Sequence, residues 1–367
     1  MRYLFFTNTP AHVHLYKYPV AALLDRGHEV RVLARDYGCT TALLDYYDLP
    51  YEVYGRADTT KGSLFRQLPR HYVSIFRRAW RYDPDVIFGI GGYAAHAGAV
   101  TRTPTVLVMD SEPTSLDHAV SRPFAWAILT PRAFGKDLGR KHYEFAGFKE
   151  SAYLHPDVFE PSPVRDDLGV GPDEPFVVLR FNAFGSHHDV RHSGIGPDER
   201  RTLVDRLSEH ATVFVSDEAG RESWDGVDAR PFDLHPGRLH DVLAEASLLV
   251  ADTQTMVTEA ALLGTPAIRS NSFVGEDDMG NFLELERHGL VYNVPAFEAV
   301  LERAEELLDD PSVPERWARR RDEFVADTVN LSEIIVDVAT NGGAVEQVPA
   351  LQQRASRPHP HATYTNA

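Results

Sequence analysis

Two threonines and a glutamate near residue 255 have the spacing of a nucleotide-binding turn. Thr253 and Thr255 follow the apolar segment 248–251 and precede a stretch of helical periodicity, with Glu259 one turn later. The start of a helix presents unpaired N–H groups and a partial positive charge, which suit a diphosphate. A carboxylate one turn along could accept both hydroxyls of a ribose. An ordinary N-cap followed by a solvent-exposed glutamate would show the same spacing.

Side chains that could move a proton follow two predicted strands of the first half. His12 and His14 come after the strand 3–7, and Asp110 and Glu112 come after a later strand. A group with a pKa near neutrality is the best general base, so either histidine could deprotonate a hydroxyl, and the two acids compete for that role. A histidine that only caps a helix or lies in a loop is the structural alternative.

A cation and an amide follow the first strand of the second half. Arg180 and Asn182 come at the end of the apolar segment 176–179, where a guanidinium could meet a diphosphate. A surface arginine paired with a neighbouring acid is the alternative. The loop 186–192 contains three histidines without metal-ligand spacing, and the predicted cleft loops carry no Asp-x-Asp motif. We therefore expect a metal-independent protein with no cofactor.

Strands alternate with helices in both halves of the chain, which predicts parallel βαβ units. We expect an acceptor domain over 1–155, a Pro-rich linker over 156–175, a nucleotide domain over 176–340 and a disordered tail over 341–367. The predicted fold class is α/β, with two Rossmann-like, doubly wound domains facing across a cleft. In such sheets, ligands bind at the carboxyl ends of the strands.

Composition limits the partners and the location. The 367 residues carry a formal net charge of −17, which repels nucleic acid, so we expect no nucleic-acid partner. Only five residues are lysines, and such acid-rich, lysine-poor surfaces are typical of halophilic proteins. No apolar run reaches the roughly 18 residues of a membrane span. With a single cysteine as well, the sequence predicts a soluble cytoplasmic protein.

The second half resembles GT-B glycosyltransferases. Glu259, Gly264 and Pro266 keep the spacing of the donor-nucleotide motif in the lipid-linked N-acetylglucosaminyltransferases of peptidoglycan synthesis, and Asn281 to Gly289 resembles the next element of that family. The resemblance implies a nucleotide-diphosphate sugar as donor, with uridine as the base. Where that family has glutamines that touch the sugar, this chain has acids. The predicted donor-binding residues are Arg180, Asn182, Thr253, Thr255, Met256, Glu259, Asp278 and Asn281.

The first half resembles the same family. The segment from Thr9 to His12 is similar to the family's first loop, which implies His12 as the catalytic base. Gly91, Gly92 and Tyr93 resemble its second glycine loop, which implies an acceptor-side position.

Three segments carry a closer resemblance: the loop Asn8 to His14, the stretch Ser111 to Pro113 and the helix from Thr255 to Pro266. They are similar to a mainly archaeal family of predicted glycosyltransferases, known only as a domain of unknown function. We expect transfer of a sugar to an unidentified acceptor, with a lipid-linked molecule as one candidate. A UDP-N-acetylglucosamine 2-epimerase-like enzyme and a non-catalytic nucleotide-sugar-binding protein are the alternatives.

The predicted helix 63–82 is rich in arginine. It contains Arg66, Arg70, Arg77, Arg78 and Arg81, and no acid lies between Arg66 and its end. Such a helix could rest on an anionic membrane and bring the protein to a lipid-linked acceptor. A core-facing helix with solvated arginines is the alternative.

Overall fold

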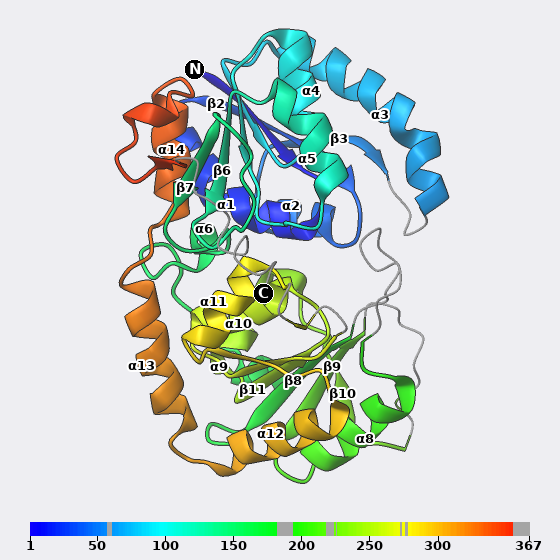
Figure 1. The fold of residues 1–367 in the computed structure, drawn as a ribbon. Helices are drawn as coiled ribbons and strands as arrows, with labels where there is room; N and C mark the ends of the chain where they lie inside the picture. Colours follow the sequence, from blue (N-terminus) through cyan, green and yellow to red (C-terminus); the bar gives the residue numbers. More distant parts are fainter. Residues whose placement is uncertain are drawn as a thin grey trace, which may run out of the picture. The chain divides into compact units, whose positions relative to one another are not determined.

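The computed structural model describes residues 1–56, 61–181, 194–217, 224, 226–271, 274–275 and 278–354. The chain forms two compact units (Figure 1). Unit 1 contains residues 1–158 and the segment from 328 onward, and unit 2 contains residues 159–327.

Unit 1 is built on an eight-stranded sheet in the order β14-β7-β6-β5-β4-β1-β2-β3. Its strands are β1 Arg2–Thr7, β2 Glu29–Asp36, β3 Tyr51–Arg56, β4 Val86–Gly89, β5 Thr105–Val108, β6 Ala127–Pro131, β7 His142–Phe145 and β14 Gln352–Gln353. All neighbouring strands are parallel except β14, which is antiparallel to β7. Residues 3–6 of β1 are completely buried, as expected for a parallel strand covered on both faces.

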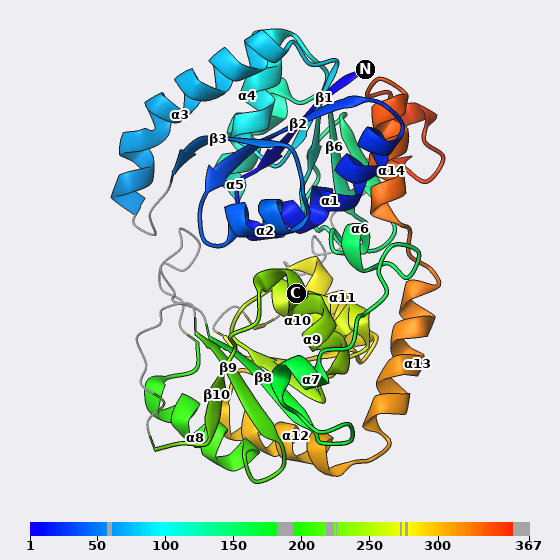
Figure 2. The same cartoon turned by 180° about the vertical axis from the view of Figure 1, so that it is seen from behind.

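Helices cover both faces of this sheet (Figure 2). One group of mutually packed helices is α1 Pro10–Asp25, α2 Thr40–Tyr46, α6 Ser151–Leu154 and α14 Leu331–Thr340. The other is α3 Lys61–Tyr82, α4 Gly92–Thr101 and α5 Ser115–Ser121. The second group encloses a core of aliphatic and aromatic residues that includes Phe6, Ile75 and Ile87. Among the described helices, none is both long enough and apolar enough to cross a bilayer.

Unit 2 has a six-stranded parallel sheet in the order β10-β9-β8-β11-β12-β13. Its strands are β8 Phe176–Phe181, β9 Thr212–Asp217, β10 Ala229–Pro231, β11 Leu248–Ala251, β12 Ala267–Arg269 and β13 Val291–Asn293. Its helices are α7 Arg165–Leu168, α8 Pro197–Leu207, α9 Leu239–Glu245, α10 Thr255–Leu263, α11 Gly280–Arg287, α12 Phe297–Asp309 and α13 Val313–Val325. Helix α10 packs against α9, α11 and α13, and α8 packs against α12.

Two doubly wound α/β units confirm the predicted fold class, while the cleft between them stays a prediction. The domain boundaries in the structure differ from those that we expected. Helix α14 packs on α1 and α6, so it belongs to unit 1 and not to a domain over 176–340. Part of the expected linker is bound to unit 2, where the backbone N–H groups of Ser162 and Val164 donate to the carboxylates of Asp241 and Glu245 at 2.9 and 3.1 Å.

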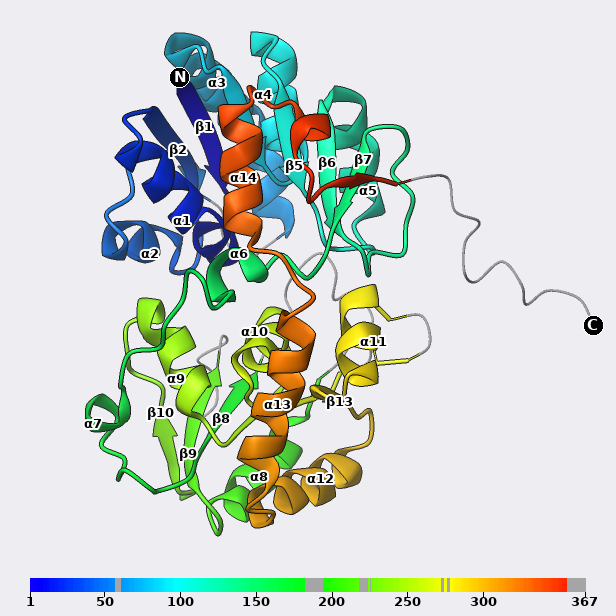
Figure 3. The same cartoon turned by 90° about the vertical axis from the view of Figure 1, so that its left-hand side faces the viewer.

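The expected disordered tail is wrong for residues 341–354. This segment follows α14 and returns to the sheet, where β14 pairs with β7 at its edge (Figure 3). Val345, Val348 and Leu351 are buried, and their burial holds the segment on unit 1. Residues 355–367 lie outside the described part of the chain.

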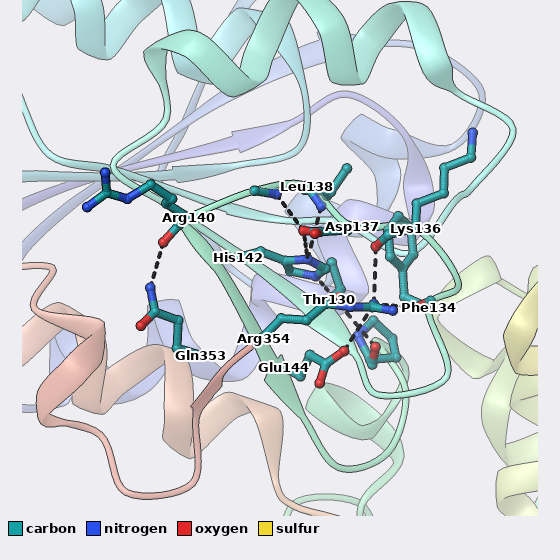
Figure 4. Close-up of polar contacts among 12 residues, drawn as sticks. Thr130, Phe134, Lys136, Asp137, Leu138, Arg140, His142, Glu144, Gln353 and Arg354 are labelled. Atoms are coloured by element: carbon teal, nitrogen blue, oxygen red, sulfur yellow. Dashed lines mark hydrogen bonds and ion pairs between the residues drawn. The ribbon is translucent and has the colours of Figure 1, made fainter. Parts of the chain in front are cut away.

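Arg354 fixes the end of this segment (Figure 4). Its Nη1 lies 3.0 Å from Oε1 of Glu144, and both side chains are more than nine-tenths buried. The same nitrogen donates to the backbone carbonyls of Phe134 and Lys136 at 2.7 and 3.1 Å. Gln353 adds a bond from Nε2 to the carbonyl of Arg140. Arg354 therefore ties the C-terminal strand to the loop between β6 and β7.

We expect Arg354→Ala to lower the free energy of unfolding by about 3 kcal/mol, because it leaves the carboxylate of Glu144 buried without its counter-charge. Urea denaturation measures the change. The matched control is Arg140→Ala, whose side chain is exposed and which should change stability by less than about 0.5 kcal/mol. Equal stabilities of the two variants would contradict the role of Arg354.

Candidate functional site

One row of side chains crosses the carboxyl edge of the sheet in unit 2. The strand register aligns Ser216, Arg180, Ala251, Arg269 and Asn293, so all five lie on the same face. Nη1 of Arg180 donates to Oγ of Ser216 at 2.6 Å. The small side chain of Ala251 separates the two arginines. This row therefore places two guanidinium groups beside the loop that leads into α10.

The start of α10 has free hydrogen-bonding capacity. Its N-cap residue, Gln254, makes no side-chain cap. The hydroxyl of Thr253 is buried and has no hydrogen-bond partner within the described ranges. Thr255 is the first residue of the helix, and Met256 is buried beneath it. The uncapped N–H groups and the Thr253 hydroxyl can bind an anion at this position.

Glu259 is held by a histidine that sequence reasoning missed. The carboxylate is 2% exposed, so the alternative of a solvent-exposed glutamate is wrong. Its Oε1 lies 3.1 Å from Nε2 of His240 in α9, which is equally buried. No motif marks His240, because only the packing of α9 on α10 brings it to Glu259.

Asp278 forms a buried ion pair with Arg269. Both side chains are almost completely buried, and the guanidinium lies 3.7 Å from the ring centroid of Phe282. Burial raises the pKa of Asp278 and lowers that of Arg269, while each partner opposes the shift of the other. Within the described residues, Nε and Nη1 of Arg269 have no hydrogen-bond partner. The Asp278 carboxylate, predicted to be a donor-binding residue, is thus committed to Arg269.

The structure describes only some of the remaining residues that we predicted for the donor site. Nδ2 of Asn281 donates to Oγ1 of Thr258 at 3.2 Å, which orients the start of α11 against α10. Asn182 and the loop 186–192 lie outside the described residues, so their predicted contacts stay predictions. Among the residues that the structure does describe, no group of three or more His, Cys, Asp or Glu side chains could hold a metal ion.

In unit 1, Asn8 binds three residues at the carboxyl edge of the sheet. Its backbone N–H donates to Nδ1 of His12 at 3.2 Å, and its backbone carbonyl accepts from Nε of Arg35 at 3.0 Å. Its side-chain oxygen accepts from the hydroxyl of Tyr54 at 2.8 Å. Asn8 is 8% exposed, so these bonds are shielded from water. The loop after β1 therefore fixes an imidazole, a guanidinium and a phenol together.

The bond from Asn8 determines which nitrogen of His12 carries the proton. Loss of hydration, with the charges of Lys149 and Arg35, lowers the pKa of His12 to about 3, so the ring is neutral near pH 7. Because Nδ1 accepts from a backbone N–H, the proton of the neutral ring must be on Nε2. His12 thus presents a donor, whereas a general base needs a free lone pair.

The other proposed bases have different surroundings. His14 is 4% exposed and packs against the rings of Tyr47 and Tyr153, so it faces the core of unit 1. Oε1 of Glu112 accepts from the backbone N–H of Gly135 at 3.1 Å. Asp110 lies 2.5 Å from Nζ of Lys149, with about a quarter of its side chain exposed. Asp110 is thus partly exposed, whereas Oε2 of Glu112 is buried.

The glycine loop before α4 holds a carboxylate of the chain itself. Oδ1 of Asp117 accepts from the N–H of Gly92 at 3.1 Å. Gly91 has φ of +77°, and a Cβ there would lie 2.4 Å from Asp117 Oδ2. Tyr93 connects this loop to Asn8, because its ring packs against that of Tyr54 at 5.3 Å between centroids.

Solved structures similar to this chain include an epimerase and glycosyltransferases. The UDP-GlcNAc 2-epimerase from Neisseria meningitidis bound to UDP-GlcNAc aligns with a TM-score of 0.65 and 12% identity, over 93% of this chain and 100% of its own. The glycosyltransferase SnogD from Streptomyces nogalater aligns with a TM-score of 0.63 and 16% identity, over 94% and 99%. A Streptomyces sp. SF2575 glycosyltransferase complexed with thymidine diphosphate has a TM-score of 0.61 and 16% identity, over 93% and 99%.

At these identities the likeness is one of fold, and the chain has the GT-B fold. No protein-family model matches the sequence, and no curated protein matches it. The resemblance to the mainly archaeal family therefore stays a prediction.

We expect Asp278→Asn to lower the free energy of unfolding by about 3 kcal/mol or more, because it leaves the guanidinium of Arg269 buried without a counter-charge. Urea denaturation checks this. The double variant Arg269→Met, Asp278→Leu removes both charges and should recover most of the loss. A single variant as stable as the wild type would contradict the buried pair.

Proposed function

We propose that the protein is a glycosyltransferase that uses a nucleotide-diphosphate sugar with uridine as its base. The observation that carries this proposal is the start of α10, which has no side-chain cap, with the buried hydroxyl of Thr253 beside it, for which the described residues supply no hydrogen-bond partner. Arg180 lies at the same edge of the sheet. Proteins of the same fold bind UDP-GlcNAc and thymidine diphosphate, which supports a nucleotide-linked sugar as the ligand.

The donor site follows from these contacts. The diphosphate lies at the first N–H groups of α10, where Thr253 and Thr255 add hydroxyl donors and Arg180 adds a positive charge. Glu259 accepts hydroxyls of the ribose, and His240 holds its carboxylate in place. These groups also stabilise the negative charge that develops on the leaving nucleotide diphosphate, so the site needs no metal.

We propose that Asp110, rather than His12, accepts the proton of the acceptor hydroxyl. A base must accept a proton, and the Nδ1 of His12 is engaged by Asn8 while its Nε2 carries the proton of the neutral ring. Asp110 lies at the carboxyl end of β5 and is partly exposed, so an acceptor hydroxyl can reach it. The carbon–oxygen bond of the donor breaks as the acceptor oxygen attacks, and the proton moves to Asp110.

A 2-epimerase-like reaction is the second candidate. It is favoured by the fold likeness to the UDP-GlcNAc 2-epimerase and by the position of Asp110 and Glu112 at one strand end. A non-catalytic nucleotide-sugar-binding protein would keep the donor site without using Asp110.

A panel of nucleotide sugars distinguishes these reactions, in buffers of low and high salt with candidate lipid acceptors present. Released nucleotide diphosphate supports transfer, interconverted sugars support epimerisation, and binding without turnover supports a binding protein.

Glu259→Ala should weaken UDP binding by about tenfold or more in calorimetry. Asp110→Asn should lower turnover by about 100-fold or more, while the protein still binds the nucleotide sugar. Glu112→Gln is the matched control for this substitution. Unchanged UDP affinity in Glu259→Ala would remove the donor-site assignment.

We also propose that α3 contacts an anionic membrane at the inner face, where a lipid-linked acceptor would lie. The helix buries His71, Ile75, Ala79 and Tyr82, so one face belongs to the core. The opposite face exposes Val73 and Trp80, at 69% and 68%. The exposed arginines of that face are Arg66, Arg70, Arg77 and Arg81.

A second set of exposed apolar residues is linked to α3 through His96. Leu116 and Trp126 are 75% and 58% exposed, and Phe124 is 49% exposed. Phe124 packs on His96 at 5.0 Å between ring centroids, and Nδ1 of His96 bonds to the hydroxyl of Tyr72 in α3. Apolar side chains among arginines, in a chain of net charge −17, match a bilayer with anionic headgroups.

Vesicle sedimentation tests the membrane contact. We expect binding to vesicles that contain phosphatidylglycerol and much weaker binding to pure phosphatidylcholine, since each arginine near an anionic surface contributes about 1 kcal/mol. The double variant Arg77→Gln, Trp80→Ser should bind the anionic vesicles about tenfold or more weakly than the wild type. Arg303→Gln in unit 2 is the control. Equal binding of these two variants would contradict the proposal.

A further inference from the structure

Arg35 lies where β2 carries a β-bulge. The register of β2 against β3 shifts between Ala34 and Arg35, so that Ala34 faces Val53 and Arg35 faces Gly55. Bulges change the direction of a side chain and are frequent beside active sites. The bulge thus sets the direction of Arg35 at the carboxyl end of the strand, next to Asn8.

The guanidinium of Arg35 has unused donors. It has five N–H groups in a planar fork. Within the described ranges, it makes one hydrogen bond, from Nε to the carbonyl of Asn8, and no ion pair. It also lies 5.2 Å from the ring centroid of Tyr37. The neighbouring Asp36 is bound to Arg56 at 2.8 Å, so this carboxylate does not neutralise Arg35. Arg35 is partly exposed, and a ligand can reach it.

The groups around Arg35 are donors as well. Asn8 holds both Arg35 and His12, and the tautomer of His12 gives an N–H at Nε2. The positive charge of Arg35 contributes to the low pKa of His12 and opposes the burial that raises the pKa of Tyr93. Lys149, the other cation near His12, is bound to Asp110. This part of unit 1 is therefore positive and rich in N–H donors, although the chain as a whole is acidic.

The other anion-binding position at this sheet edge is already filled. The start of α4 donates from Gly92 to Asp117, and that carboxylate lies against Gly91. An anionic ligand at this position would have to displace Asp117 and overcome its charge. Arg35 has no such internal partner among the described residues.

We propose that Arg35 and His12 bind an oxyanion, a phosphate or a carboxylate, on the molecule that receives the sugar. The inference rests on the proposed function. The guanidinium can bind two oxygens of such a group in parallel, which gives orientation as well as affinity. The N–H at Nε2 of His12 supplies a further donor. The acceptor would then be an acidic molecule, held by unit 1 while its hydroxyl reaches Asp110.

The test uses the intact protein saturated with UDP, titrated with inorganic phosphate or with acetate at constant ionic strength. The ring resonances of His12 report binding by NMR. We expect a saturable shift with at least one anion, and the stronger of the two identifies the ligand class. Arg35→Gln should weaken the binding of this anion by about tenfold or more. Arg35→Lys keeps the charge without the planar fork, so it should weaken the binding by less.

Arg56→Gln is the matched control, since Arg56 is paired with Asp36 at the surface. It should leave the anion affinity unchanged. The proposal is overturned if neither anion moves the His12 resonances, or if Arg35→Gln binds the anion as tightly as the wild type. UDP affinity should be the same in all these variants. Failure of UDP binding would instead remove the donor site, and the anion titration can then be run without UDP.

Discussion

Asn8 is the residue on which the site in unit 1 depends. It uses its backbone N–H for His12, its backbone carbonyl for Arg35 and its side-chain oxygen for Tyr54. The first bond makes His12 a donor at Nε2, and the second leaves most of the Arg35 fork available. Because Asn8 itself is buried, these bonds do not compete with water and the three side chains are held in place before any ligand binds.

Two buried side-chain pairs lie near α10 in unit 2. Glu259 is held by His240, and Arg269 by Asp278, and all four side chains are almost completely buried. Buried polar groups are tolerated when they are hydrogen-bonded, so each pair fixes its residues at a set position near α10. The uncapped start of α10 and the hydroxyl of Thr253 lie beside these pairs. The same elements thus support the fold and leave a polar position for a diphosphate.

The alternation of strands and helices predicted both sheets, because buried parallel strands and amphipathic helices have distinct patterns. It could not show that α14 packs on α1, since periodicity gives a helix but not its partner. The same limit explains why Arg35 and His240 were missed. A strand-end arginine and a helical histidine carry no motif, and only the bulge in β2 and the packing of α9 on α10 give them a role.

The tautomer of His12 is the most direct test of this account. Nitrogen-15 NMR of the ring distinguishes a protonated from an unprotonated nitrogen. With a pKa of about 3, the ring should stay neutral at neutral pH, with Nδ1 unprotonated and the proton on Nε2. A proton on Nδ1, or a doubly protonated ring near pH 7, would contradict the bond from Asn8 and with it the assignment of His12 as a donor.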